Sequence, residues 1–150
     1  MTKAIAARFS LALLVPVTFL AVSLTAVAAR AQARLYNPIT IPPSNELSDT
    51  LTENDIPTGE GGFARDYIIN LNGGDQVAID LISENFDTIV TLLASDGSTV
   101  AENDDGPDGS TNSLLFARIT ETGKYLIRVR AFGETGGGAF QLKVTRLRPI

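Results

Sequence analysis

Cysteine, histidine and tryptophan are absent from this 150-residue chain, and its one methionine is Met1. Without histidine or cysteine the chain has no Ser-His-Asp or Cys-His pair, no imidazole base and no thiolate nucleophile. The usual zinc sites are excluded too, because zinc favours cysteine and histidine ligands. No disulfide can form, so a hydrophobic core must supply the stability. These absences predict a protein that is not an enzyme.

The N-terminal residues 1–33 differ from the rest of the chain. Lys3 and Arg8 give a positively charged start, and residues 11–27 form an apolar run without a charge. Small residues at alternate positions follow, up to Ala33. This order is typical of a secretory signal peptide, and we expect cleavage after Ala33. The mature protein should then be secreted or periplasmic.

Two alternatives to this cleavage position remain. Cleavage after Ala31 or Ala28 fits the same pattern of small residues. An uncleaved membrane anchor is the other, since the apolar run approaches the roughly 18 to 20 residues that span a bilayer. Pro16, Ser23 and the alanine-rich end of the run argue against an anchor. We therefore expect no membrane span after signal cleavage.

Removal of residues 1–33 leaves 117 residues, enough for one hydrophobic core and one domain. Three of the 12 Lys and Arg are lost and all 17 Asp and Glu remain, so the net charge becomes −8. Such an acidic chain should not bind nucleic acid through its net field. Residues 34–45 contain three prolines, which favour an extended backbone, and we expect a linker or arm there.

The remaining residues, 46–150, alternate apolar and polar side chains in short runs that are separated by Gly, Asp and Asn. This pattern predicts antiparallel strands, and strands in this number favour an all-β, two-sheet sandwich. Two hairpins are expected, each from two runs and a glycine-containing turn. Their strands are residues 67–71 with 77–81, and residues 125–131 with 140–144.

Short motifs along residues 46–146 resemble, in order and spacing, the bacterial pre-peptidase C-terminal domain. They are Asp66-Tyr67, Gly74-Asp75, Phe86-Asp87-Thr88, Asn103-Asp104-Asp105, Thr122-Gly123-x-Tyr125 and Gly138-x-Phe140-x-Leu142-x-Val144. The resemblance implies a jelly-roll-like antiparallel β-sandwich that assists secretion, localisation or substrate binding of an extracellular peptidase. Some relatives bind calcium. Because 117 residues leave no room for a peptidase domain, we expect this chain to act on a partner in trans.

One acidic loop is a candidate metal site. Asn103, Asp104, Asp105 and Asp108 crowd a segment rich in Gly and Pro, and Asp87 begins a strand that this loop could approach. Clustered oxygen ligands on an irregular loop suit Ca²⁺. The alternative is that these side chains cap backbone amides in turns, as Asp and Asn commonly do.

Two further groups of charged residues are weaker candidates. The resemblance implies calcium ligands at Glu53, Asp55 and Asp66, at positions similar to those of collagenase relatives. Arg128, Arg130 and Lys143, joined by Arg118, should share the solvent face of the last hairpin, where a basic strip could bind an anionic partner. Ordinary solubilising charges are the alternative for this strip.

The sequence therefore predicts a secreted, non-catalytic binding or accessory module that calcium could stabilise. Its partner would be a protein or polysaccharide in the envelope or medium, and a secreted peptidase is one candidate. The alternative is a structural envelope protein, or a chaperone or inhibitor that acts in trans on a secreted peptidase.

Overall fold

The structure is a computed structural model that describes residues 36–133 and 136–147, so the expected signal peptide lies outside the described residues. Strands and turns account for all secondary structure in this part, and it contains no helix that could cross a membrane. The strands are β1 (Ile39–Thr40), β2 (Glu46–Leu51), β3 (Ile56–Pro57), β4 (Phe63–Leu71), β5 (Gln76–Ile82), β6 (Thr88–Leu93), β7 (Thr99–Asn103), β8 (Ser113–Arg118), β9 (Gly123–Ala131) and β10 (Gly138–Leu147).

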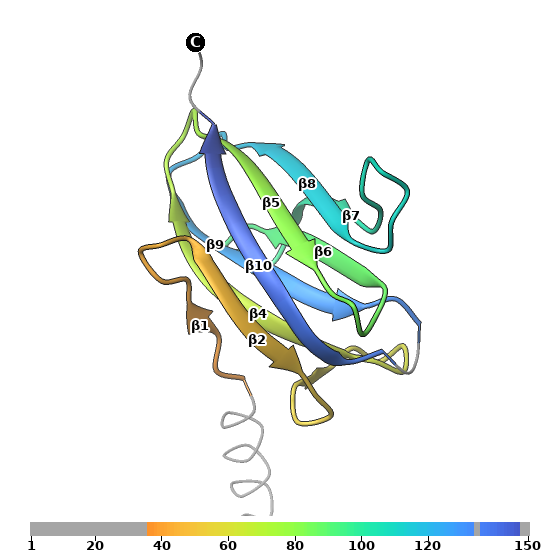
Figure 1. Ribbon diagram of the computed structural model, residues 1–150. Helices are drawn as coiled ribbons and strands as arrows, with labels where there is room; N and C mark the ends of the chain where they lie inside the picture. The colour runs from red at the N-terminus through yellow and green to blue at the C-terminus, as the bar shows by residue number, and fades with distance from the viewer. Residues whose placement is uncertain (1–35, 134–135, 148–150) are drawn as a thin grey trace, which may run out of the picture. The chain divides into compact units, whose positions relative to one another are not determined.

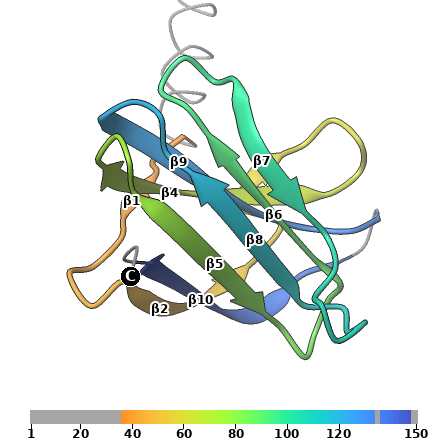
Figure 2. The same ribbon diagram turned by 90° about the horizontal axis from the view of Figure 1, so that it is seen from above.

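The strands form two sheets that pack face to face as a β-sandwich (Figures 1 and 2). The six-stranded sheet has the order β1-β4-β9-β6-β7, with β3 also paired to β4. The four-stranded sheet has the order β2-β10-β5-β8. Neighbouring strands are antiparallel except β1 and β4, which are parallel. The predicted all-β, antiparallel sandwich is confirmed.

The core lies between the sheets and is built by alternation along each strand. Tyr67, Ile69 and Leu71 of β4 point inward and are nearly inaccessible, and β5, β9 and β10 contribute alternate residues in the same way. Each buried aliphatic or aromatic side chain contributes about 1.5 to 3 kcal/mol through removal of apolar surface from water. The ring of Phe140 contacts Tyr67 edge-on, at 6.3 Å between centroids, and so joins the two sheets.

Both predicted hairpins are wrong. β4 and β5 belong to different sheets, and so do β9 and β10. The turn at residues 72–75 and the segment after β9 therefore cross from one sheet to the other. Alternation shows which side chains face inward, but it does not distinguish pairing within a sheet from packing across two sheets. A true hairpin joins β6 to β7.

The predicted linker contributes to the sandwich wherever the structure describes it. β1 pairs with β4, and Ile41 is only 8% exposed and belongs to the core. The Ile41 amide donates to the Ile68 carbonyl oxygen at 2.9 Å, and the Val144 amide donates to that of Asn45 at 2.8 Å. The proline-containing segment is thus fixed to both sheets by its backbone.

Candidate interaction surface

The predicted calcium loop holds its own turns with its side chains. Asn103 Oδ1 accepts hydrogen bonds from the amides of Asp105 and Leu114, both at 3.1 Å. Asp108 Oδ1 accepts from the Ser110 amide at 3.1 Å and from its hydroxyl at 2.7 Å. These bonds lower the pKa of Asp108, the Ser110 hydroxyl having the largest effect. Asn103 and Asp108 therefore cap backbone amides in turns, as the alternative to a calcium site predicts.

The five predicted ligands do not form a preformed metal site. Asp104 and Asp105 are exposed on the loop, and Asp87 is half-buried where β6 begins. In residues 36–133 and 136–147, no three acidic side chains come together in a group that could hold a metal ion. A calcium ion at this loop would compete with the two hydrogen bonds of Asn103 Oδ1, whereas those of Asp108 use only Oδ1 of its carboxylate. Calcium binding stays a prediction.

Of the predicted acidic group Glu53, Asp55 and Asp66, Glu53 is exposed in a turn, and Asp55 shares an arginine with the nearby Asp49. Asp55 Oδ1 lies 2.6 Å from Arg65 Nη1, and Asp49 Oδ2 lies 2.9 Å from Arg65 Nε. The Tyr67 hydroxyl donates to Asp49 Oδ2 at 2.8 Å, so β2 and β4 are tied together at one edge of the sandwich. Burial and then this hydrogen bond raise the pKa of Tyr67 well above its usual value.

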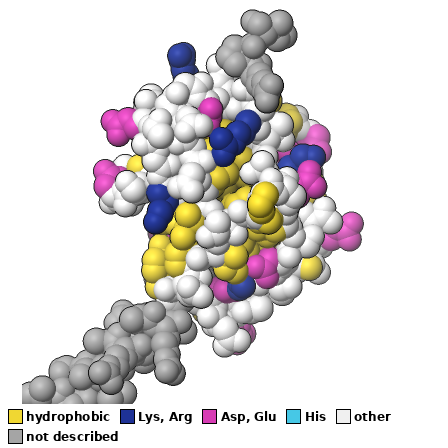
Figure 3. All heavy atoms as spheres, turned by 90° about the vertical axis from the view of Figure 1, so that its left-hand side faces the viewer, with side chains coloured by type: hydrophobic (Ala, Val, Ile, Leu, Met, Phe, Trp, Pro, Cys, Tyr) yellow, Lys and Arg dark blue, Asp and Glu magenta, His cyan; other side chains and the backbone are white. Residues whose placement is uncertain are grey.

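The same edge is the side of the molecule on which β1 and β2 lie. Figure 3 views this side and shows a band of hydrophobic side chains with Lys, Arg, Asp and Glu around it. Among the exposed hydrophobic residues of the N-terminal segment are Tyr36 and Ile39.

Asp66, the third member of the predicted acidic group, lies on the outer side of the six-stranded sheet. We call this side the six-stranded face; it is formed by Ala64, Asp66, Ile89, Thr91, Leu93, Leu126, Arg128 and Arg130. Arg128 binds Asp66 in a bidentate manner, with Nε and Nη2 each 2.8 Å from a carboxylate oxygen. The Asp66 side chain is 0% exposed. The carboxylate raises the pKa of Arg128, and burial and then Asp66 raise that of Tyr36 beside it.

Hydrogen bonds continue across this face to its edge strand. Thr91 lies opposite both Arg128 and Glu102, and its hydroxyl donates to Glu102 Oε2 at 2.7 Å. Arg130 Nη2 lies 3.2 Å from the same oxygen. The Thr91 hydrogen bond has the largest effect and lowers the pKa of Glu102; burial, the next largest, opposes it, and Arg130 lowers the pKa further. Polar groups on the six-stranded face are therefore paired with one another.

The predicted basic strip does not exist as one surface. Arg128 and Arg130 lie on β9 in the six-stranded sheet, whereas Lys143 lies on β10 in the other sheet. Arg118 is on β8, at the far edge of that second sheet. The error follows from the wrong hairpin, because a hairpin would have placed β9 and β10 on one surface.

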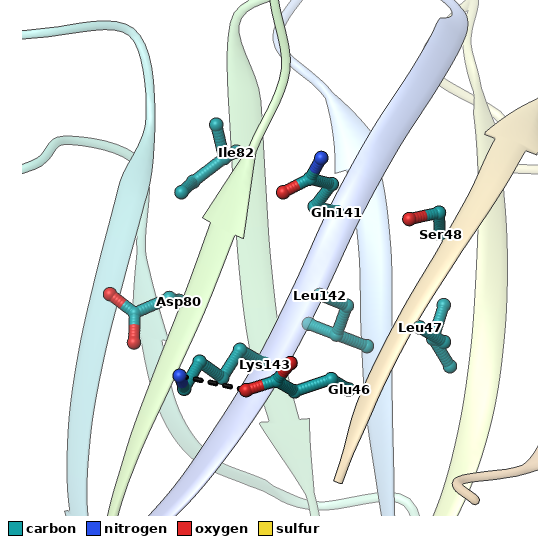
Figure 4. Close-up of a pocket in the computed structure, with 8 residues that line it drawn as sticks. All are labelled: Glu46, Leu47, Ser48, Asp80, Ile82, Gln141, Leu142 and Lys143. Carbon is teal, nitrogen blue, oxygen red and sulfur yellow. Dashed lines mark ion pairs between the residues drawn. The ribbon is translucent and has the colours of Figure 1, made fainter. Parts of the chain in front are cut away.

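The outer side of the four-stranded sheet is more open. We call it the four-stranded face; it is formed by Glu46, Ser48, Ala78, Asp80, Ile82, Leu114, Phe116, Gln141 and Lys143. A hollow of about 610 Å³ lies over β2, β10 and β5 (Figure 4). A second hollow of about 540 Å³ adjoins it and shares Ser48, Ile82 and Gln141. Together they form a groove that is open to solvent.

Apolar side chains on the four-stranded face are exposed. Phe116 of the edge strand β8 is 63% exposed, and Ile82 of β5 is 45% exposed. Leu114, half-buried, lies on β8 between them, and Ala78 lies directly opposite Phe116. Among the charged groups of this face, Lys143 Nζ contacts Glu46 Oε1 at 2.7 Å, with both side chains more than half exposed.

Sequence reasoning did not single out Asp80, Ile82 or Phe116. Residues 113–118 read Ser-Leu-Leu-Phe-Ala-Arg, with apolar residues on both faces of the strand, so alternation alone could not show which face is solvent. The one available signal was an aromatic residue at a position that alternates with the inward-facing Leu115.

Comparisons with known proteins agree with this fold. The family model for the bacterial pre-peptidase C-terminal domain matches residues 64–131. The pre-peptidase C-terminal domain of collagenase from Bacillus anthracis is similar in structure, with a TM-score of 0.56 at 12% sequence identity, covering 73% of this chain and 95% of that one. These findings confirm the resemblance to this family, whose domains are non-catalytic accessory modules.

A second solved structure shares the fold. PliG from Aeromonas hydrophila, a periplasmic inhibitor of g-type lysozyme, gives a TM-score of 0.50 at 14% identity, over 73% of this chain and 96% of that one. No curated protein matches the chain. At identities this low the two structures show a shared sandwich fold.

Proposed function

We propose that this chain, whose residues 64–131 match the bacterial pre-peptidase C-terminal domain, is a secreted or periplasmic accessory module that binds another protein through its four-stranded face. The chain lacks histidine, the commonest acid-base group, and cysteine, the most reactive nucleophile, which supports a binding role. Its expected signal peptide and the periplasmic location of PliG support export.

The observation that carries this proposal is the exposure of Phe116 and Ile82 on a sheet face that also holds a groove. Scattered apolar residues are normal on protein surfaces, but a contiguous apolar patch with a polar rim often marks a protein-protein interface. Here Leu114 and Phe116 are successive outward residues of β8, and Ile82 lies diagonally across from Leu114 on β5. Aromatic residues are also enriched in interfaces.

A hydrolase outside the cell membrane is the partner class that fits best. One structurally similar protein is a domain of a collagenase, and the other inhibits a lysozyme. A module of the same fold could act on such a hydrolase as a targeting factor or as an inhibitor. The first candidates for direct tests are therefore a secreted peptidase and a g-type lysozyme.

A retention experiment tests the proposal. The immobilised protein is exposed to concentrated periplasm and culture medium of its host, in parallel with the double variant Ile82→Ser, Phe116→Ser. We expect a specific protein to be retained by the wild type and lost by the double variant. Val100→Ser, which removes an exposed apolar side chain from the other sheet, is the matched control and should retain it.

Polysaccharide binding is the second candidate function, because the groove beside the apolar patch is lined by Ser48, Thr50 and Gln141. Hydroxyl and amide groups of this kind hydrogen-bond sugars well. Retention on cell-wall or matrix polysaccharide, with no protein retained, would support this candidate and contradict the protein-partner proposal.

A further inference from the structure

Among the described residues, the carboxylate of Asp80 has no partner of its own in the groove, and the inference drawn from it rests on the proposed function. Its half-buried carboxylate lies on the four-stranded face, in the wall of the groove. No ion pair or side-chain hydrogen bond to Asp80 occurs in the part of the chain that the structure describes. In contrast, Asp49, Asp55 and Asp66 each contact an arginine. We propose that Asp80 receives an arginine side chain of the protein partner.

The nearest cation does not neutralise Asp80. Lys143 lies directly between Glu46 and Asp80 in the strand register, and its ammonium group bonds to Glu46 (Figure 4). Glu46 is the main cause of the raised pKa of Lys143, and the charge of Asp80 makes the smallest contribution. The Asp80 carboxylate lies on the side of β5 away from β10. It thus remains open to a cation from outside.

The surroundings of Asp80 favour arginine over lysine. Leu114 lies directly opposite on β8, Phe116 lies two residues further along that strand, and Ile82 is the next outward residue on β5. Diagonal neighbours across two antiparallel strands are within reach of long and aromatic side chains. A guanidinium group can bind a carboxylate through two parallel N–H groups while its flat side packs on an aromatic ring. An ammonium group provides only a point charge.

Charge also favours a basic partner. The groove carries the carboxylates of Glu46, Asp80 and Glu84 and the single ammonium group of Lys143. Complementary charge increases the rate of encounter and excludes acidic competitors. We therefore infer that the partner presents a surface arginine within a basic region, next to an apolar group that covers Phe116.

A titration with a small probe tests the arginine site without the partner. N-acetyl-arginine-N-methylamide is added to ¹⁵N-labelled protein, and amide chemical shifts are followed by NMR. We expect weak, saturable shifts that cluster at Ile82, Leu114 and Phe116. The neutral citrulline analogue should produce none of them. Equal shifts with citrulline, or shifts that cluster elsewhere, would overturn the proposal.

Two substitutions should change this binding in opposite directions. Asp80→Asn is nearly isosteric and should lower the affinity for the probe by about tenfold, as expected for loss of a charged partner. Lys143→Met removes the nearest positive charge and should strengthen binding of the probe. Since this change also frees Glu46, the double variant Glu46→Gln, Lys143→Met is needed and should bind at least as tightly as the wild type. Asp96→Asn, which changes an exposed carboxylate in the turn between β6 and β7 of the other sheet, is the control and should bind the probe as the wild type does. An Asp80→Asn protein with unchanged affinity would contradict the inference.

The retained partner then separates this inference from the proposed function. If Ile82→Ser, Phe116→Ser loses the partner and Asp80→Asn keeps it, the four-stranded face binds protein and the arginine site is wrong. If neither variant loses it, the proposed function fails as well. If both variants lose the partner, and 0.5 M salt restores its retention by neither variant, the result supports both proposals.

Discussion

The two outer faces of this sandwich differ in how their side chains are partnered. On the six-stranded face Asp66 is fully buried under Arg128, and Thr91 joins Glu102 to Arg130. On the four-stranded face Phe116 is 63% exposed, and the Lys143–Glu46 pair stands in solvent. Both faces belong to sheets that lack a covering helix in the described residues. The comparison shows that one face is closed by its own polar network, whereas the other is available for contact.

The physical reason lies in what each pair contributes. An exposed ion pair stabilises a protein by about 0 to 1 kcal/mol, because water screens it and both side chains lose freedom. Breaking a buried pair costs much more, since one charge is left without a partner or water. The six-stranded face is therefore structural. Its residues should respond to mutation through stability, whereas those of the four-stranded face should respond through binding.

The largest effect is expected for Arg128→Ala. It leaves the Asp66 carboxylate, which is 0% exposed, without its bidentate partner. The free energy of unfolding should fall by about 3 to 5 kcal/mol. Urea denaturation measures this loss. Arg118→Ala on the other sheet removes an exposed arginine and should change stability by less than about 0.5 kcal/mol. Similar losses for the two variants would remove the distinction between the faces.

The Thr91–Glu102 hydrogen bond should give a smaller, pH-dependent effect. Thr91→Val removes the donor and should cost about 1 kcal/mol at neutral pH, as is usual for one hydrogen bond. The pKa of Glu102 is lowered in the folded protein, first by Thr91. Its contribution to stability is therefore present above the unfolded pKa of about 4.3 and lost as the pH falls through the folded value.

The stability of Thr91→Val should therefore fall less steeply than that of the wild type as the pH is lowered. Without the Thr91 hydroxyl the folded pKa of Glu102 moves back towards its ordinary value, so less stability is lost on acidification. Urea midpoints of the wild type and Thr91→Val, measured between about pH 5 and pH 2, should converge. Parallel curves would show that the hydrogen bond does not form in solution.

Some of this comparison could be predicted from the sequence, and some could not. In the strands predicted at residues 67–71, 125–131 and 140–144, the apolar residues Tyr67, Val129 and Leu142 are buried, because the two-residue period of a strand fixes which side faces the core. It could not fix which strands are neighbours. Asp66 and Arg128 are 62 residues apart, and their contact depends on the pairing of β4 with β9.

The candidate site shows the same limit. The carboxylates that stood out in the sequence, such as Asp55 and Asp108, are held by an arginine or by a turn in the structure. Asp80 did not stand out, because nothing in its neighbourhood in the sequence shows that its carboxylate would lack a partner. Whether the Asp80 carboxylate has a partner depends on residues of neighbouring strands, which are far from Asp80 in the sequence.

Calcium should have a weak effect, if the predicted loop site binds it with the affinity of extracellular sites. Dissociation constants of about 10⁻⁴ to 10⁻³ M would add roughly 1 kcal/mol of stability at 2 mM calcium. Thermal melts in calcium and in EDTA measure this. Asp105→Asn should abolish the difference, and Asp96→Asn, in another exposed turn, should keep it. Identical melts of the wild type in both buffers would contradict the calcium prediction.

The smallest change in stability is expected for Phe116→Ser, and this result decides whether the four-stranded face is free. The side chain is 63% exposed and packs little, so the free energy of unfolding should change by less than about 0.5 kcal/mol. Leu115→Ser, one residue earlier and 2% exposed, is the matched control and should cost several times more. A large loss for Phe116→Ser would mean that the ring supports the fold, and the contrast between the two faces would then no longer identify a binding surface.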